Sequence, residues 1–289
     1  MSRHVALATC AEFPQGDEDA AALVSALGRC DISGFWRAWT DPAVDWAAFA
    51  AVVVRSTWDY PANLEAFVSW ANSVPRLHNS ADVIAWNSDK RYLSELAARG
   101  VPTVPTLVLE PGEIAELPNH EFVVKPSVGA GSKGAGRFVP DQAGTALAHM
   151  QLLHDAGRVV LIQPYLGDVD TAGETALMYF NGRYSHAVRK GAMLPADTAN
   201  DLSFTESLYV AEEISTATPS SDELRVGDQV VAGLAELGMA DLLYCRVDLL
   251  PSPDGPVLIE VELTEPSLFL GYDAQAADRF AAALAERLS

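Results

Sequence analysis

Two stretches near the C-terminus, YCRVD at residues 244–248 and IEVE at residues 259–262, say most about the fold. Both are apolar except for one arginine and three carboxylates. The turn-rich segment PSPDGP lies between them, which predicts two strands joined as a hairpin. Side chains alternate between the two faces of a strand. The arginine and the aspartate of the first stretch therefore share one face, as do the two glutamates of the second.

These three carboxylates are Asp248, Glu260 and Glu262. On a part-buried sheet they would repel one another unless a cation lay among them. Carboxylate oxygens suit Mg²⁺, which proteins hold with one or two carboxylates together with substrate phosphates. We therefore expect the three acids to bind Mg²⁺. A solvated acidic face, neutralised by Arg246 and water, is the alternative that these residues leave open.

Composition excludes several classes of partner. The 289 residues carry a formal net charge of −20, with 19 basic against 39 acidic residues. Nucleic acids and anionic membranes need basic surfaces, so we expect neither as a partner. The three cysteines have no metal-type or disulfide-framework spacing, and no stretch fits a signal peptide or a membrane span. These features predict a soluble cytoplasmic protein that acts on a small molecule, and they leave a homodimer open.

The chain divides into three predicted units: an N-terminal α/β domain at residues 1–86, a central lobe at residues 87–166 and a C-terminal lobe at residues 167–289. The first unit alternates apolar runs with helical patterns, which is typical of a parallel sheet covered by helices. Ser88 predicts the N-cap of a helix. The polar residues 191–218 predict a mobile loop.

A polar and aromatic cluster follows the second buried strand of the N-terminal unit. It contains Arg55, Thr57, Trp58 and Asp59. Open α/β sheets bind ligands at the carboxyl ends of their strands, so these residues are candidates for substrate binding. The alternative is that the aromatic rings pack in the core and Asp59 caps the turn before Pro61.

The loop GAGSKGAG at residues 129–136 matches the pattern GxGxxG. A dinucleotide site requires a helix directly after it, whereas the β-like residues 137–139 follow, so that interpretation fails. A strand–loop–strand flap remains, whose backbone N–H groups can surround phosphate oxygens. Gly131, Ser132 and Lys133 are the candidates there.

Two further lysines and one strand exit complete the predicted nucleotide site. Lys125 interrupts an apolar strand and Lys90 lies near the start of a predicted helix. Together they can neutralise a polyphosphate, although each alone is also explained as a surface lysine. Gln163, Tyr165 and Leu166 end a buried strand and can offer hydrogen-bonding groups to adenine, or they simply form an ordinary strand exit with Tyr165 in the core.

In this order and spacing, the motifs resemble the ATP-grasp superfamily over roughly residues 87–270. The resemblance implies an α/β fold in which an N-terminal α/β domain precedes two α+β lobes that clasp ATP. It implies that Asp168 or Asp170 lies near the ribose and that Asp248, Glu260 and Glu262 hold Mg²⁺. The last metal ligand of the superfamily is usually asparagine, so Glu262 departs from the pattern.

Residues 55–60, 173–190 and 262–267 are most similar to the cyclo-ligase branch, which closes O-ureido-D-serine to D-cycloserine and so serves antibiotic biosynthesis. This resemblance implies that ATP activates an amino-acid-like carboxylate as an acyl phosphate, which a nitrogen of the same molecule attacks. It implies catalytic roles for Arg246, on the acyl phosphate and the oxyanion, and for Lys190. The alternatives are a two-substrate carboxylate–amine ligase of dipeptide or glutathione-synthetase type, and a non-catalytic nucleotide-binding protein.

Overall fold

A four-stranded parallel sheet in the order β2-β1-β3-β4 forms the N-terminal part of the molecule. The computed structural model describes residues 3–129, 131, 133–192, 194 and 213–289. The apolar side chains of β1 and β3 are buried, as the predicted βαβ pattern requires. The elements are β1 (Arg3–Thr9), α1 (Ala20–Arg29), β2 (Ile32–Ala38), β3 (Ala51–Val54), α2 (Leu64–Ser73) and β4 (Leu77–His78).

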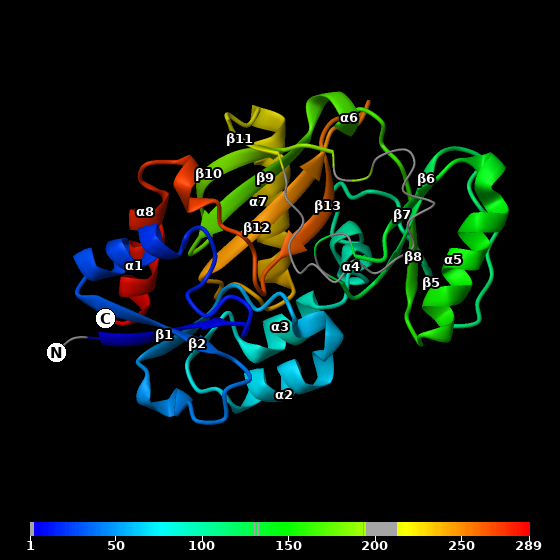
Figure 1. Ribbon diagram of the computed structural model, residues 1–289. Helices are drawn as coiled ribbons and strands as arrows, with labels where there is room; N and C mark the ends of the chain where they lie inside the picture. Colours follow the sequence, from blue (N-terminus) through cyan, green and yellow to red (C-terminus); the bar gives the residue numbers. More distant parts are fainter. Residues whose placement is uncertain (1–2, 130, 132, 193, 195–212) are drawn as a thin grey trace.

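A five-stranded antiparallel sheet in the order β11-β10-β9-β12-β13 forms the C-terminal lobe (Figure 1). The turn at Asn181-Gly182 joins β9 to β10, and both residues have positive φ, at 46° and 72°, as a tight hairpin turn requires. The elements are α6 (Val169–Ala172), β9 (Glu174–Phe180), β10 (Arg183–Lys190), β11 (Ile214–Ala217), α7 (Ser221–Glu236), β12 (Tyr244–Leu250) and β13 (Val257–Glu262).

The two faces of this sheet belong to different cores. Even-numbered residues such as Met178, Phe180 and Tyr244 pack toward α8 (Ala276–Arg287) and the N-terminal domain. Odd-numbered residues such as Leu177 and Val247 pack toward α7. This separation confirms the period-two pattern of the sequence and places Arg246 and Asp248 on the same face as Tyr244.

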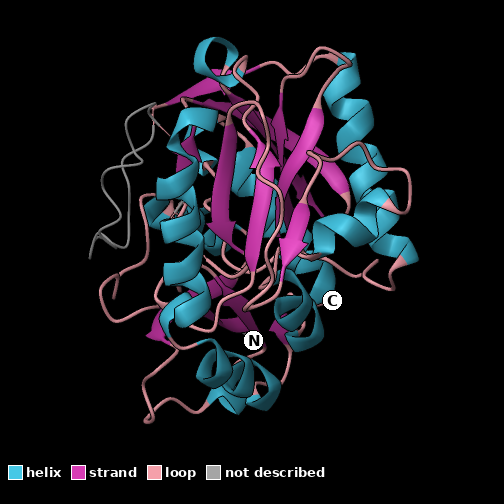
Figure 2. Ribbon diagram, turned by 90° about the vertical axis from the view of Figure 1, so that its right-hand side faces the viewer, coloured by secondary structure: helices cyan, strands magenta, loops and turns pink. Residues whose placement is uncertain are grey.

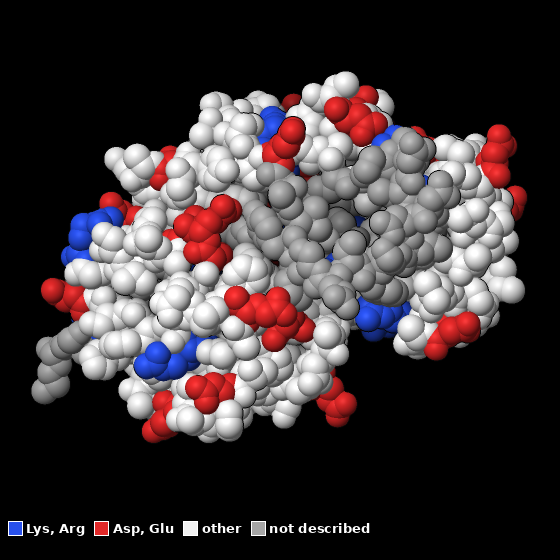
Figure 3. All heavy atoms as spheres, viewed as in Figure 1, with Lys and Arg blue, Asp and Glu red and all other residues white. Residues whose placement is uncertain are grey.

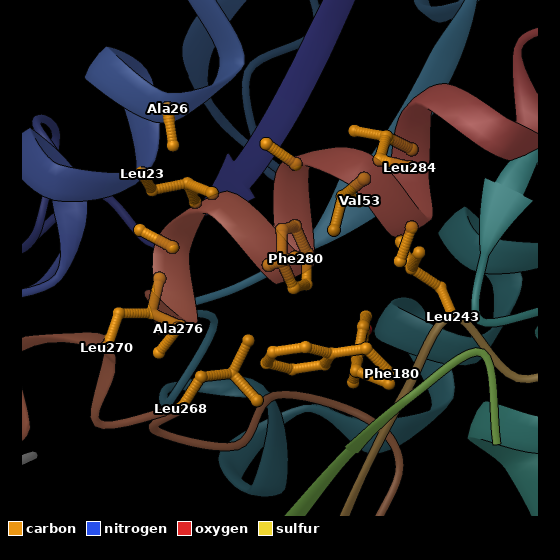
Figure 4. Close-up of a cluster of buried hydrophobic side chains, with 14 of the residues drawn as sticks. Leu23, Ala26, Val53, Phe180, Leu243, Leu268, Leu270, Ala276, Phe280 and Leu284 are labelled. Atoms are coloured by element: carbon orange, nitrogen blue, oxygen red, sulfur yellow. The ribbon is translucent and has the colours of Figure 1, made fainter. Parts of the chain in front are cut away.

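The C-terminal helix returns to the N-terminal domain, so that β1 and the C-terminus lie on the same side of the molecule (Figure 1). Phe280 of α8 contacts Phe180 edge-on, with ring centroids 5.2 Å apart. Figure 4 shows these rings among Leu23 of α1, Val53 of β3 and Leu268. One continuous apolar cluster therefore joins the N-terminal sheet to the C-terminal lobe.

The central lobe is an antiparallel sheet in the order β5-β8-β6-β7 with α5 packed on one face. It contains the predicted glycine flap between β6 and β7. Figure 2 shows the strands in the middle of the molecule with helices on either side. The elements are β5 (Leu107–Leu109), β6 (Phe122–Pro126), β7 (Gly136–Phe138), α5 (Ala143–Asp155) and β8 (Val160–Pro164).

Two short helices, α3 (Ala81–Asn87) and α4 (Tyr92–Ala97), connect the N-terminal and central parts. Their residues Val83, Tyr92 and Leu96 pack with the C-terminal sheet and α7. The boundary predicted at residue 87 groups α4 with the central lobe, whereas its packing joins it to the C-terminal lobe. The sequence shows that a helix is amphipathic but not which sheet its apolar face covers.

The predicted helix start at Ser88 is wrong. Ser88 ends α3, and its hydroxyl donates to the carbonyl of Ile84 at 2.7 Å. The helix expected after Ser88 is present as α4, but its N-cap is Arg91, which makes no side-chain cap. Most of the loop predicted at residues 191–218 lies outside the described residues, and its last part forms β11 rather than irregular structure.

The surface carries the negative charge that the composition requires. Figure 3 shows acidic side chains spread over the visible face, with basic side chains between them. No helix among the described residues has the length and apolar character needed to cross a lipid bilayer.

Candidate active site

A cleft opens between the central and C-terminal lobes, with an empty volume of about 1040 Å³ that includes space open to solvent. All four lysines of this acidic chain line it. The predicted site residues on its walls are Lys90, Lys125, Gly131, Lys133, Gln163, Tyr165, Leu166, Lys190, Glu260 and Glu262.

The remaining predicted site residues lie elsewhere. Ser132 is outside the described residues. The others do not line the cleft, although Arg246 and Asp248 are buried on the neighbouring strand. Those outside the cleft wall are Arg55, Thr57, Trp58, Asp59, Asp168, Asp170, Arg246 and Asp248.

Two lysines reach the cleft from different elements, as the sequence predicts. Lys90 precedes α4 and pairs with Glu260 (Nζ–Oε1 3.0 Å), and it donates to the carbonyl of Gly129 in the flap at 2.6 Å. Burial opposes its charge, but the neighbouring carboxylates outweigh burial and raise the pKa of Lys90. Lys125 lies on β6, where burial and the nearby Lys90 lower its pKa to about 8 despite the attraction of Glu260.

The acidic hairpin has the predicted register. Arg246 lies opposite Glu262, and Asp248 lies opposite Glu260. Arg246 binds Asp248 through two bonds (Nε–Oδ1 2.9 Å and Nη2–Oδ2 2.8 Å) and also binds Glu262. Burial raises the pKa of Glu262, and the neighbouring Glu260 and Asp248 add to this.

Asp248 is held by cations on two sides. Besides Arg246, it pairs with Lys190 of β10 (Nζ–Oδ2 3.4 Å). Burial would raise the pKa of Asp248, but the two cations outweigh it and lower the pKa to about 2. Lys190 also pairs with Glu174 at 2.7 Å, a residue on the cleft wall that sequence reasoning missed. Its only signal in the sequence is a lone acid at the start of an apolar strand.

The described residues contain no group of three or more His, Cys, Asp or Glu side chains arranged around a metal position, so the expected binding of Mg²⁺ by all three acids stays a prediction. Asp248 is engaged by Arg246 and Lys190. Glu260 and Glu262 do line the cleft. Two carboxylates with substrate phosphates are a usual ligand set for Mg²⁺, so these two acids fit such an ion.

Side chains from α3 and α4 fix the strand that carries these two acids. β13 is an edge strand, and its outer backbone groups bond to the segment around Thr103 at Leu258 but to no neighbouring strand among the described residues. The hydroxyl of Tyr92 donates to the carbonyl of Val261 and accepts from its N–H, both at 2.9 Å. Asn87 donates to the same carbonyl and accepts from the N–H of Leu263, both at 2.8 Å. The backbone between Glu260 and Glu262 is thereby held in place.

We expect Tyr92→Phe to lower the free energy of unfolding by about 1–3 kcal/mol, because it leaves a buried N–H of Val261 without its acceptor. Urea denaturation measures this loss. Tyr184→Phe is the matched control, since Tyr184 is 38% exposed. Equal stability of the two variants would contradict the role of Tyr92.

The outer end of the cleft is organised around Tyr165. Arg137 of β7 stacks on the Tyr165 ring, 3.5 Å from its centroid, and pairs with Glu121 at 2.6 Å. The Tyr165 hydroxyl donates to Asp170, which Arg137 also contacts at 3.3 Å. Asp170 is thus engaged by protein groups, while Asp168 lies exposed at the start of α6.

The N-terminal cluster faces the segment that follows β13 rather than the cleft. Arg55 is 0% exposed and donates to the carbonyl of Pro266 at 3.0 Å. The Trp58 indole donates to the carbonyl of Glu265 at 3.2 Å. Asp59 makes no side-chain cap and accepts from the Trp39 indole at 2.8 Å, so the capping alternative is wrong.

A buried acid beside Arg55 predicts a pH effect on stability. Burial raises the pKa of Asp19 from 3.8 to about 6, although Arg55 opposes the change. The ionised form is therefore costly in the folded protein: the stability that Asp19 contributes is complete below pH 3.8 and is lost as the pH rises through 6. At ~1.4 kcal/mol for each tenfold change in acidity, the cost at neutral pH is at most ~3 kcal/mol.

We expect Asp19→Asn, which resembles the protonated acid, to be more stable than the parent protein at pH 7.5. The advantage shrinks as the pH falls toward 4. Parallel urea denaturation of both proteins between pH 4 and pH 7.5 tests this, because titrations of other groups cancel in the difference. A difference that stays constant with pH, or that grows toward acid, would show that Asp19 is not the group responsible.

Known proteins share both the sequence and the fold. The N-terminal domain family of D-cycloserine synthetase DcsG matches residues 5–79. Cycloserine biosynthesis protein DcsG of Streptomyces lavendulae is 39% identical over 302 residues, which cover 98% of both proteins. The crystal structure of D-cycloserine synthetase DcsG matches with a TM-score of 0.88 at 37% identity, over 99% of this chain and 100% of that one.

More distant structures share the fold. D-alanine–D-alanine ligase from Bacillus anthracis has a TM-score of 0.65 at 14% identity, over 99% of this chain and 97% of its own. A RimK-domain ATP-grasp protein from Sphaerobacter thermophilus has a TM-score of 0.66 at 17% identity, over 96% and 98%. The predicted ATP-grasp fold is confirmed. The chain belongs to the family of D-cycloserine synthetase DcsG, and it is an ATP-grasp ligase that uses ATP to form a C–N bond.

Proposed function

We propose that this enzyme closes O-ureido-D-serine, or a closely similar amino-acid derivative, to D-cycloserine. The full-length similarity to D-cycloserine synthetase DcsG supports the substrate class. The observation that carries the proposal is the distribution of charge. A chain with a net charge of −20 places all four of its lysines around one cleft that also contains Glu260 and Glu262. Such a cleft suits a polyphosphate held between ammonium groups and a cation-binding pair of acids.

In this proposal Lys90 and Lys125 hold the phosphates, assisted by the flap at Gly131, Ser132 and Lys133. Gln163, Tyr165 and Leu166 bind the adenine. Asp168 is the better candidate for the ribose, because Asp170 is already engaged by Arg137 and Tyr165.

Glu260 and Glu262 would hold Mg²⁺ together with the phosphates. When bound, the ion would offset the charge that develops during phosphoryl transfer. Lys90 pairs with Glu260 and Arg246 pairs with Glu262, so each of the two acids has a cation beside it. The chain thus supplies both the donor oxygens and the charges that keep them in position.

Ring closure then needs two steps, the formation of an acyl phosphate and an attack on its carbonyl carbon. A substrate carboxylate oxygen bonds to the γ-phosphorus as the bond to ADP breaks, which gives an acyl phosphate. A nitrogen of the same molecule attacks the acyl carbon, phosphate leaves, and the ring closes with the loss of a proton from nitrogen. The carbamoyl group that this nitrogen carries in O-ureido-D-serine is then removed by one water molecule and leaves as CO2 and NH3. Arg246 would stabilise the oxyanion of the tetrahedral intermediate, and Lys190 would stabilise the acyl phosphate. Holding both ends of one substrate in place makes the second step unimolecular.

The test supplies candidate substrates singly and in pairs with Mg-ATP and measures phosphate release and products. We expect O-ureido-D-serine alone to give ADP, phosphate and D-cycloserine, together with CO2 and NH3 from its carbamoyl group. Phosphate release that requires a second amino acid would identify a two-substrate ligase. Binding of ATP without turnover of any substrate would identify a nucleotide-binding protein. Either result would refute the cyclo-ligase proposal.

A further inference from the structure

The six residues that follow the acid strand, residues 263–268, are called the strap here. Each of their backbone carbonyls accepts a hydrogen bond from a side chain of another segment, because this irregular buried backbone has no ladder to satisfy it. The donors, in strap order, are Asn79 (2.7 Å), Tyr244 (2.8 Å), Trp58 (3.2 Å), Arg55 (3.0 Å), Arg246 (3.3 Å) and His186 (2.9 Å).

Three of these donors belong to the N-terminal domain and three to the C-terminal sheet. The end of the strap is also held by apolar packing, since Leu268, Phe269 and Leu270 are buried in the cluster that joins the two parts. Figure 4 shows Leu268 and Leu270 beside Phe180 and Ala276. The strap is therefore the segment through which the N-terminal domain contacts the end of the acid strand.

Among these donors, Arg55 is the one whose complete burial as a charged group costs free energy. It is wholly buried, pairs with Asp17 at 3.3 Å and with Asp19 at 4.0 Å, and its Nε atom has no hydrogen-bond partner among the described residues. Asp19 in turn lies near the backbone N–H groups of Leu270 and Gly271, which oppose the rise of its pKa. Well-packed apolar residues often stabilise a fold as much as such an ionic cluster, so stability alone does not account for this arginine. The role of this arginine is instead to hold the strap in one exact position.

Arg55 and Arg246 hold neighbouring carbonyls, those of Pro266 and Ser267. Arg246 also binds Asp248 and Glu262, so its guanidinium joins the strap to both strands of the acidic hairpin. Consecutive Cα atoms lie ~3.8 Å apart, and a displaced Pro266 therefore moves the acceptor of Arg246 with it.

We propose that Arg55 is a positioning residue that acts through the strap to fix the guanidinium of Arg246. It makes no contact with the cleft. Its loss should therefore impair the step that Arg246 serves and leave nucleotide binding intact. This catalytic consequence rests on the proposed function, whereas the effect on Arg246 itself does not.

The main variant is Arg55→Lys. It keeps a positive charge beside Asp17 and Asp19 but lacks the planar, forked head that reaches Pro266 and Asp17 together. Arg55→Met removes the charge as well. Arg76→Met is the matched control: Arg76 also binds main-chain carbonyls of the N-terminal domain, those of Ala47 and Phe49, but it is exposed and has no contact with the strap.

The first readout needs no substrate. In protein labelled with ¹⁵N-arginine, the Nε–H of Arg246 donates to Asp248 and gives a protected signal, identified by its loss in Arg246→Lys. We expect Arg55→Lys to shift this signal and to speed its hydrogen exchange, with faster amide exchange across residues 263–271. Arg76→Met should change neither. An unchanged Arg246 signal in folded Arg55→Lys overturns the proposal, whatever the enzyme turns over.

The second readout is kinetic. We expect kcat of Arg55→Lys to fall by roughly 10- to 100-fold, while the Kd for Mg-ATP changes less than about twofold. A merely structural role predicts lower thermal stability with an unchanged kcat at temperatures where the variant is folded, and that outcome overturns the proposal. If the unmodified enzyme fails to turn over any substrate, the proposed function falls, and the Arg246 signal still decides whether Arg55 positions it.

Discussion

Glutamine at position 260 is expected to lower kcat by about 10²–10³-fold, the usual cost of removing one preorganised electrostatic group from an active site. Glu260 lies on the cleft wall and carries the charge that faces Lys90 at 3.0 Å. Glutamine keeps its shape and loses that charge. We also expect a higher Mg²⁺ concentration at half-maximal activity.

Initial rates of ADP formation over a range of Mg²⁺ concentrations measure both effects. Glu236→Gln is the control, because Glu236 ends α7 as an exposed acid. Turnover of Glu260→Gln near the rate of the parent enzyme would place the metal outside the acidic hairpin.

Replacing Lys125 by methionine is expected to raise the Kd for ATP by roughly 30-fold or more, since removing one partner of a buried ion pair costs about 2 kcal/mol or more. Burial lowers the pKa of Lys125, so the positive charge destabilises the protein when no nucleotide is bound. The methionine variant should therefore be at least as stable as the parent protein. Calorimetric titration with ATP measures the change. Arg183→Met, which removes an exposed positive charge on β10, is the control. Unchanged affinity in Lys125→Met would remove this lysine from the nucleotide site.

The same lysine predicts a pH dependence of binding. With a pKa of about 8, Lys125 loses its proton as the pH rises from 7 to 9, so the Kd for ATP should rise over this range. Arginine stays charged at these values. We therefore expect Lys125→Arg to bind ATP with a flatter pH profile, and identical profiles would exclude Lys125 as the titrating group.

The acidic hairpin was predictable because its information is local. Period-two alternation and turn residues specify which side chains share a face, and the register of Arg246 with Glu262 and of Asp248 with Glu260 follows. The lysines of the cleft could be predicted for another reason. The chain has few lysines, and a charged side chain on an apolar strand indicates a site that needs its charge.

The sequence does not show which side chains form ion pairs and hydrogen bonds with one another. Asp248 was expected to face a metal, but Arg246 and Lys190 reach it from the same sheet. Arg55 was expected to bind substrate, and its acceptor lies 211 residues away in the strap. Tyr92 and Asn87, which hold the acid strand, are separated from it by about 170 residues along the chain. Such contacts depend on the docking of whole elements, which local patterns do not encode.

The most direct test of the central claim, that a carboxylate is activated by phosphoryl transfer in this cleft, uses O-ureido-D-serine labelled with ¹⁸O in its carboxylate. With Mg-ATP, the account predicts that an oxygen atom of the carboxylate leaves in the phosphate released alongside ADP. Unlabelled phosphate, or the formation of AMP and pyrophosphate in place of ADP, would contradict it.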